Sequence, residues 1–206
     1  MEKNKLKLIL ASSSPRRKEL VGHLNLPFEI VVKNVLEVSN FKDPINFSRD
    51  IAQLKGDAVF KERQDECLVV SADTIVCLGT KIYGKPANEA EARIFLSELS
   101  GKTHSVFTAV TMNLNYNNQR VSYSFVEESK VTFNKIVPAV MERYLETKDS
   151  LDKAGAYGIQ GPSLTFISKV DGDYANVVGF PLSRFVLECE TLFQPYTSGK
   201  SWFDLF

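Results

Sequence analysis

An apolar run from Cys67 to Leu78, interrupted by polar side chains only near its centre, constrains the fold more than any other stretch. Continuous apolarity on both sides of that polar centre predicts a strand buried on both faces. Such a strand lies in the interior of a sheet that helices cover. Burying a carboxylate there is costly unless a partner pairs with it, so Asp73 is the first candidate functional residue.

Strand and helix patterns alternate along the rest of the chain. This alternation favours an α/β domain with a mixed, twisted sheet and flanking helices. Helices are predicted over residues 15–24 and 43–63, from the cap Asn88 to a stop at Gly101, and from Pro138 and Pro181 onward. Strands are predicted over residues 6–10, 28–32 and 81–83, with hairpins over 104–133 and 165–178 that turn at Asn117-Asn118 and Asp171-Gly172.

Length and charge indicate one domain without a membrane or nucleic-acid partner. The 206 residues can bury a core, and we expect residues 1–206 to form a single domain whose tail, 194–206, has no predicted structure. Lys plus Arg and Asp plus Glu balance at 25 each, so no overall field attracts nucleic acid or a membrane surface. The three cysteines are widely spaced without a C-x-x-C pair, and no segment approaches a membrane span, which together favour the cytoplasm.

A serine-rich turn leads from the first strand into the first helix. Ser14 suits the N-cap position and Pro15 suits the first helical position. Arg16 and Arg17 then place positive charge at the helix end that prefers carboxylates. A bound phosphate would resolve this conflict, because backbone N–H groups, serine hydroxyls and guanidinium groups would converge on it. The alternative is that the two arginines pair with surface carboxylates such as Glu19.

Further polar side chains interrupt apolar patterns or lie in irregular loops, and together they form a candidate site. Its cations can neutralise a triphosphate, while its carboxylates can hold a divalent ion and deprotonate a water for attack on a phosphoric anhydride. No G-x-S-x-G or G-x-x-x-x-G-K-[ST] motif is present, so the serine-rich turn is the expected phosphate cradle. The candidate residues are Ser12, Ser14, Arg16, Arg17, Glu37, Lys55, Asp73, Lys85, Asp152, Lys153 and Gln160.

Five motifs stand out in order along the chain. They are Ala11-Ser12-Ser13-Ser14-Pro15-Arg16-Arg17, Ser71-Ala72-Asp73-Thr74-Ile75-Val76, Gly84-Lys85-Pro86, the run from Leu151 to Gly161, and Val177-Val178-Gly179-Phe180-Pro181-Leu182. Their order resembles that in Maf-like proteins, a family of nucleoside triphosphate pyrophosphatases. The resemblance runs from Leu8 to about Phe193.

The resemblance implies an elongated, two-lobed fold with a central cleft, akin to the inosine triphosphate pyrophosphatases, and a homodimer. It implies hydrolysis of a nucleoside triphosphate to the monophosphate and pyrophosphate with a divalent metal, Mg²⁺ or Mn²⁺. Matching positions make Asp73 the catalytic base. Together with the candidate residues above, this gives an expected catalytic set of Asp73, Lys55, Lys85 and Glu37. The expected metal ligands are Glu37 and Asp73. The expected substrate-binding residues are Ser12, Ser14, Arg16, Arg17, Thr74, Lys153 and Gln160.

Within the family, one branch acts on dTTP and UTP and another prefers 7-methyl-GTP, and the motifs around Arg16, Thr74 and Gln160 resemble those of the first branch. The Gln160 amide both donates and accepts, as the O4/N3 edge of uracil or thymine requires. We therefore expect a dTTP/UTP pyrophosphatase that also accepts modified pyrimidine triphosphates. The alternatives are the same reaction on 7-methyl-GTP or another purine triphosphate, and a nucleotide-binding regulator of cell division without turnover.

Overall fold

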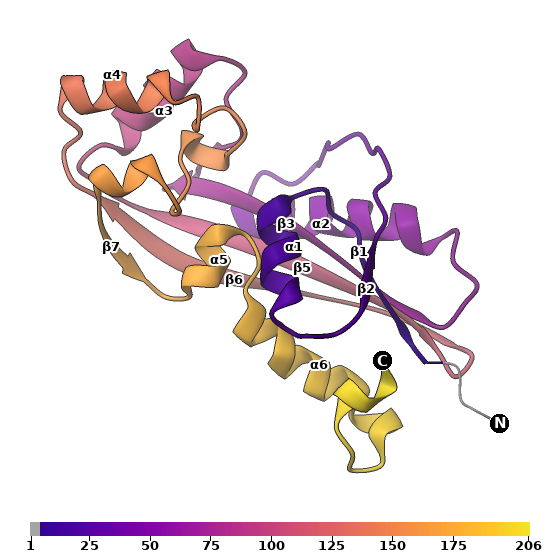
Figure 1. Cartoon of the computed structure of the whole chain (residues 1–206). Helices are drawn as coiled ribbons and strands as arrows, with labels where there is room; N and C mark the ends of the chain where they lie inside the picture. Colours follow the sequence, from indigo (N-terminus) through magenta and orange to yellow (C-terminus); the bar gives the residue numbers. More distant parts are fainter. Residues whose placement is uncertain (1–4) are drawn as a thin grey trace.

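The computed structural model describes residues 5–206, and residues 1–4 of the predicted domain lie outside this described part. One seven-stranded mixed sheet carries helices on both faces (Figure 1), which confirms the predicted α/β class. The strands are β1 (Lys7–Leu10), β2 (Phe28–Ile30), β3 (Cys67–Leu78), β4 (Lys81–Tyr83), β5 (Thr103–Tyr116), β6 (Gln119–Phe133) and β7 (Ile167–Asp171). The helices are α1 (Pro15–Gly22), α2 (Pro44–Phe60), α3 (Glu89–Leu99), α4 (Pro138–Glu146), α5 (Tyr174–Val178) and α6 (Leu182–Thr197), with short 3₁₀ turns η1 (Ala154–Ala156), η2 (Pro162–Thr165) and η3 (Trp202–Leu205).

Strand pairing leaves an opening beside the central strand. The sheet order is β2-β1-β3-β5-β6-β7, with β4 also paired to β3, and only the β1 pairs are parallel. One edge of β3 pairs with β5 from Cys67 to Cys77, while the other pairs with β1 over Cys67–Val70 and with β4 over Val76–Leu78. In the described chain no strand pairs with Ser71–Ile75 on that second edge. We call this opening the β3 gap.

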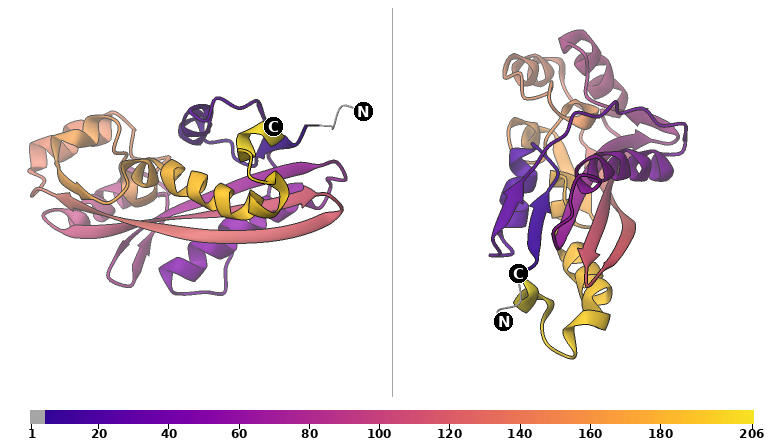
Figure 2. Two further views of the ribbon diagram at one scale, coloured as in Figure 1. Left: turned by 90° about the horizontal axis from the view of Figure 1, so that it is seen from below. Right: turned by 90° about the vertical axis from the view of Figure 1, so that its right-hand side faces the viewer.

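Neighbouring residues of β3 reach different helices because side chains alternate between the two faces of a strand. Ser71 donates a hydrogen bond to the Ala52 carbonyl of α2 (2.7 Å), and Asp73 points to the same side. Ala72 joins the cluster beneath α1 and α6 on the opposite face. Thus α2 covers one face of the sheet, whereas α1 and α6 cover the other (Figure 2).

Two large hydrophobic clusters lie toward opposite ends of the long strands β3, β5 and β6 (Figure 1). The first joins β1, α1, α6 and the C-terminal segment; the second joins α3, α4 and η1. The division of a single domain into two lobes stays a prediction. The tail, for which the sequence predicts no structure, returns through η3 and stacks Trp202 on Phe193, both buried. Over residues 5–206, no helix has the length and apolar character of a membrane span. Cys67, Cys77 and Cys189 are buried free thiols.

Local signals for helix starts and turns agree with the sequence predictions. The Asp43 side chain accepts a hydrogen bond from Asn46 N (2.9 Å) at the start of α2, and the Asn88 side chain accepts one from Glu91 N (3.0 Å) at the start of α3. The hairpin between β5 and β6 turns at Asn117 and Asn118, with φ of 50° and 60°. Asparagine tolerates this left-handed backbone, so the turn residues determine the strand register.

The predicted second hairpin is wrong in its returning strand. Strand β7 is present and pairs with β6, but Tyr174–Val178 forms helix α5. The Asp173 side chain accepts a hydrogen bond from Ala175 N (2.7 Å), which caps this helix. Val177 and Val178 favour a strand locally, and the cap together with burial against the sheet outweighs that preference.

Candidate functional site

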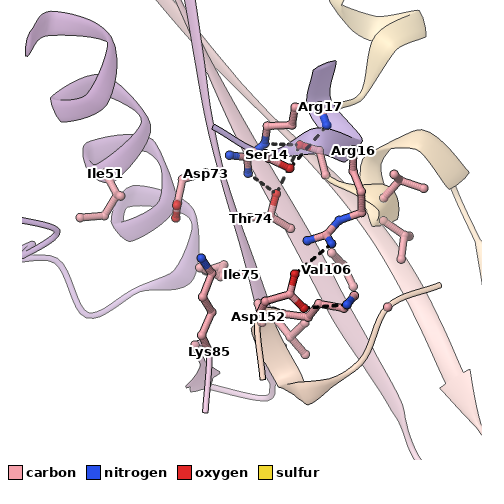
Figure 3. A pocket seen from close by; sticks show the side chains of 18 of the residues that line it. Ser14, Arg16, Arg17, Ile51, Asp73, Thr74, Ile75, Lys85, Val106 and Asp152 are labelled. Carbon is pink, nitrogen blue, oxygen red and sulfur yellow. Dashed lines mark hydrogen bonds and ion pairs between the residues drawn. The ribbon is translucent and has the colours of Figure 1, made fainter. Parts of the chain in front are cut away.

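A cleft opens at the β3 gap between the serine-rich turn, α2 and the loop after α4 (Figure 3). Its main cavity has a volume of about 470 Å³, within the usual range for small-molecule sites. An adjoining hollow of about 380 Å³ lies between the serine-rich turn and residues 32–37. The residues that line both parts are Ser14, Arg16, Arg17, Glu37, Lys55, Lys85 and Asp152.

One wall of the main cavity is charged and centres on Lys55 of α2. Lys55 Nζ lies 2.8 Å from Asp73 Oδ1 and 2.9 Å from Glu37 Oε2. The Asp73 side chain is 11% exposed, so this ion pair compensates a carboxylate that is costly to bury. No described residue donates to Asp73 Oδ2. That oxygen is therefore available to a ligand or a water in the cavity.

Arg16 enters the cleft beside a second group of charges. Arg16 Nη1 lies 3.4 Å from Asp152 Oδ2, and Asp152 also accepts a hydrogen bond from Lys153 (2.7 Å). Burial alone would raise the pKa of the Asp152 carboxyl, but Lys153 and Arg16 together hold it below its usual value. A Cβ on residue 158 would lie 2.6 Å from Lys153 Cδ, so Gly158 leaves the room that Lys153 occupies.

Arg17 is turned toward protein atoms. Its Nε donates to the Gly179 carbonyl (2.9 Å), its Nη2 to Thr74 Oγ1 (3.0 Å) and its Nη1 to Ser12 Oγ (3.4 Å). Burial lowers the pKa of the guanidinium, and the charge of Asp73 opposes this effect. Most of its donors are thus occupied, and binding of substrate by Arg17 stays a prediction.

The remaining predicted residues divide into those that line the cleft and one that does not. Lys85 lines both parts, points into the cleft (Figure 3) and forms no ion pair within residues 5–206. Ser14 lines both parts, and Ser12 lines the adjoining hollow. Gln160 is exposed on its loop and lines neither part, so its role in substrate choice stays a prediction.

The structure adds apolar lining that the sequence analysis did not include. This lining comes from α2, β3, β5, the η1 loop and α5, so no local pattern joins its members. These apolar side chains line the main cavity and are absent from the lining of the adjoining hollow. They are Phe47, Ile51, Ile75, Val76, Val106, Tyr157, Val177 and Val178.

Two carboxylates fit a divalent metal ion in donor type. Glu37 and Asp73 both supply oxygens and meet at the same ammonium group, that of Lys55. In the described part of the chain no group of three or more His, Cys, Asp or Glu residues could hold a metal. Mg²⁺ commonly takes one or two carboxylates plus substrate phosphates and water, so the donor type of this pair suits such an ion.

Comparison with known proteins gives one family. The model of the Maf-like protein family matches residues 7–192. A dTTP/UTP pyrophosphatase of Deinococcus radiodurans is 45% identical over 177 residues, covering 86% of this chain and 88% of the relative. A dTTP/UTP pyrophosphatase of Bacillus cytotoxicus is 43% identical over 196 residues, covering 95% and 98%. A solved HAM1 protein from Coxiella burnetii aligns with 15% identity and a TM-score of 0.43 over 92% of this chain and 99% of that one. On the strength of the family match and these relatives, this chain belongs to the Maf-like protein family.

Proposed function

We propose that this protein is a nucleoside triphosphate pyrophosphatase that hydrolyses dTTP and UTP to the monophosphate and pyrophosphate. The names of relatives aligned over most of the chain support this substrate pair. The structural observation that carries the proposal is the group of Asp73, Lys55 and Glu37 at the wall of a cleft that further cations line.

The two parts of the cleft suit the two parts of a nucleotide. Residues 12–14, Lys33 and Lys85 line the adjoining hollow, where serine hydroxyls and positive charge favour phosphates. Val106 and Tyr157 lie among the apolar side chains of the main cavity, which suit the flat faces of a base. A triphosphate placed in this way crosses the charged wall between its base and its terminal phosphates.

The chain's own residues supply the elements of an anhydride hydrolysis. The oxygen of a water molecule bonds to the α-phosphorus, and the bond from that phosphorus to the bridging oxygen of the leaving pyrophosphate breaks. Asp73 Oδ2 accepts the proton of the water, while Lys55 holds Oδ1 and orients the carboxylate. Arg16 and Lys85 neutralise charge on the phosphate oxygens. A divalent cation at Glu37 and Asp73 supplies further neutralisation of that charge when bound.

Dependence on Mg²⁺ or Mn²⁺, assembly as a homodimer and a cytoplasmic location belong to the same proposal. The oxygen donors of Glu37 and Asp73 support the choice of metal. Omission of the metal should abolish turnover, and analytical ultracentrifugation gives the oligomeric state.

The test is pyrophosphate release from dTTP, UTP, CTP, dATP, GTP and 7-methyl-GTP with Mg²⁺ or Mn²⁺. We expect release from dTTP and UTP, and Asp73→Asn should lower kcat by about 10²- to 10⁴-fold, as loss of a general base does. Asp171→Asn is the matched control, because Asp171 is an exposed carboxylate of β7 outside the cleft. It should keep full activity.

Three other outcomes would contradict the proposal in distinct ways. Release from 7-methyl-GTP or other purine triphosphates alone would change the substrate class. Nucleotide binding without release would make the protein a regulator. Full activity of Asp73→Asn would remove Asp73 from its catalytic role.

A further inference from the structure

A chain of hydrogen bonds runs from Arg17 through Thr74 and Thr108 to the backbone of α5, and Thr74 is its member that lines the main cavity. Arg17 Nη2 lies 3.0 Å from Thr74 Oγ1, and Thr74 Oγ1 lies 3.0 Å from Thr108 Oγ1. Thr108 Oγ1 in turn lies 3.0 Å from the carbonyl oxygen of Asn176 in α5. Thr108 and Asn176 are 0% exposed, so bulk water does not compete for these bonds.

The buried carbonyl of Asn176 determines where the Thr108 proton goes. The N–H groups of Gly179 and Phe180, which could bond to this carbonyl in a longer helix, both donate to the carbonyl of Ala175 instead. Thr108 is the donor that reaches the Asn176 carbonyl within the described residues. Because a buried carbonyl without a donor is costly, the Thr108 hydroxyl donates to Asn176.

The direction of the remaining bonds follows from this assignment. Thr108 has one proton and has used it, so Thr74 donates its own proton to Thr108. Arg17 can only donate, and it occupies one lone pair of Thr74 Oγ1. The Gly179 carbonyl lies 3.5 Å from Thr74 Oγ1 and already accepts a shorter bond from Arg17. Thr74 lines the cavity and is partly exposed, so it offers a ligand a lone pair and no proton.

We propose that Thr108 is a positioning residue that makes Thr74 a hydrogen-bond acceptor for the N3–H of a uracil or thymine base. This inference rests on the proposed function and adds its chemical basis for base choice. N3–H is the donor on the Watson–Crick edge of uracil and thymine, whereas the neighbouring O4 accepts. Cytosine has an unprotonated N3, which would place two lone pairs against each other. The arrangement therefore selects against cytosine.

The test compares kcat/KM for UTP and CTP in wild type, Thr108→Val, Thr108→Ser and Thr111→Val. Thr108→Val keeps the side-chain shape but removes the acceptor for the Thr74 proton, which frees Thr74 to donate to cytosine N3. The UTP/CTP ratio should fall about fivefold to tenfold, as expected for one hydrogen bond. Thr108→Ser should keep the wild-type UTP/CTP ratio, because serine retains the hydroxyl group. Thr111 is a matched control, since it is also 0% exposed on β5 but pairs with Ser124 Oγ (2.8 Å) away from the cavity.

Several results would overturn the inference. One is a UTP/CTP ratio of kcat/KM that is unchanged in folded Thr108→Val, and another is a wild type that prefers CTP. The inference also fails if Thr108→Ser has the same ratio as Thr108→Val, or if Thr111→Val changes the ratio as much as Thr108→Val does. An equal loss on UTP and CTP would place Thr74 against a sugar hydroxyl and would also overturn it.

A wild type that releases no pyrophosphate from any triphosphate is a failure of the proposed function. In that case calorimetric binding of UMP and CMP to the same four proteins tests the inference by itself. The same UMP preference, lost in Thr108→Val and kept in Thr108→Ser, would support it, and equal binding of both nucleotides would refute it.

Discussion

The two walls of the cavity are built from residues that are adjacent in sequence but face opposite sides of β3. Asp73 joins Lys55 and Glu37 in a group of charges, to which we assign proton transfer and cation binding. Thr74 joins hydroxyls and carbonyls whose hydrogen bonds have fixed directions. In the function and the base contact that we propose, the alternation of a single strand separates proton transfer from base recognition. Changes in one wall should leave the function of the other largely intact.

The largest effect should come from breaking the charged wall at Lys55. Lys55→Met leaves two carboxylates near each other without their counter-cation, one of them nearly buried. We expect kcat/KM for UTP to fall about 10³-fold, because Asp73 loses its orientation and the cavity loses positive charge. The UTP/CTP ratio should stay close to that of wild type. Steady-state kinetics of pyrophosphate release gives both quantities.

Lys81→Met is the control for this prediction. Lys81 forms an ion pair of 2.6 Å with Glu98, but both side chains are exposed at 53% and 37%. Removing an exposed pair of this kind changes little, so activity should be unchanged. Equal losses in the two lysine variants would show that the charged wall has no special role.

The apolar lining of the cavity should make stability depend on pH, because His104 lies against it. His104 is buried, and its Nε2 lies 2.7 Å from the hydroxyl of Tyr157, which lines the cavity. Burial lowers the pKa of His104 from 6.5 to about 4. The unfolded chain therefore takes up this proton below pH 6.5 while the folded protein does not, so stability falls as the pH drops from 6.5 to 4 and levels off below. The total loss is about 3 kcal/mol.

Urea unfolding at several pH values measures this loss. His104→Gln should remove the His104 contribution, whereas His23→Gln should keep it, because His23 is exposed. An NMR titration of wild type gives the same pKa without any variant. A His104 that titrates near 6.5 in the folded protein would contradict the prediction.

The smallest expected effects distinguish a structural role of Arg17 from a substrate-binding role of Arg16. Arg17→Gln should lower the free energy of unfolding by about 2 kcal/mol, because Arg17 donates to Gly179, Thr74 and Ser12. Arg16→Gln should leave stability nearly unchanged and raise KM for UTP about tenfold, because Arg16 faces the cleft. Thermal unfolding and kinetics on both variants provide the comparison. The reverse pattern would exchange the two assignments.

The sequence predicts those parts of the fold that depend on local chemistry. Asp43 and Asn88 cap helices as expected, and Asn117-Asn118 turns the long hairpin. Tyr174–Val178 was predicted as a strand because its valines favour one, and neither the Asp173 cap nor its packing on the sheet follows from strand propensity. The C-terminal tail has no periodicity, so the stacking of Trp202 on Phe193 was beyond prediction.

The candidate site shows a similar division. Asp73 was found because a carboxylate in a buried strand needs a partner, and Lys55 is that partner. Spacing alone does not tell which of Arg16 and Arg17 enters the cleft, since both lie in one helical turn. Thr108 carried no signal at all, because a threonine in a strand is ordinary and its importance comes from two contacts distant in sequence.

The end of β1 at Leu10 sets the width of the β3 gap, where the cleft opens. Because the opening exists only where this strand stops short of its neighbour, its width depends on how many residues β1 contributes to the sheet. If β1 were longer, its added residues would pair with Ser71–Ile75 of β3 and close the entrance of the cleft. Residues added at the far hairpin tip of β5 and β6 would leave it unaltered. The number of residues in β1 is therefore a determinant of the size of the cleft entrance.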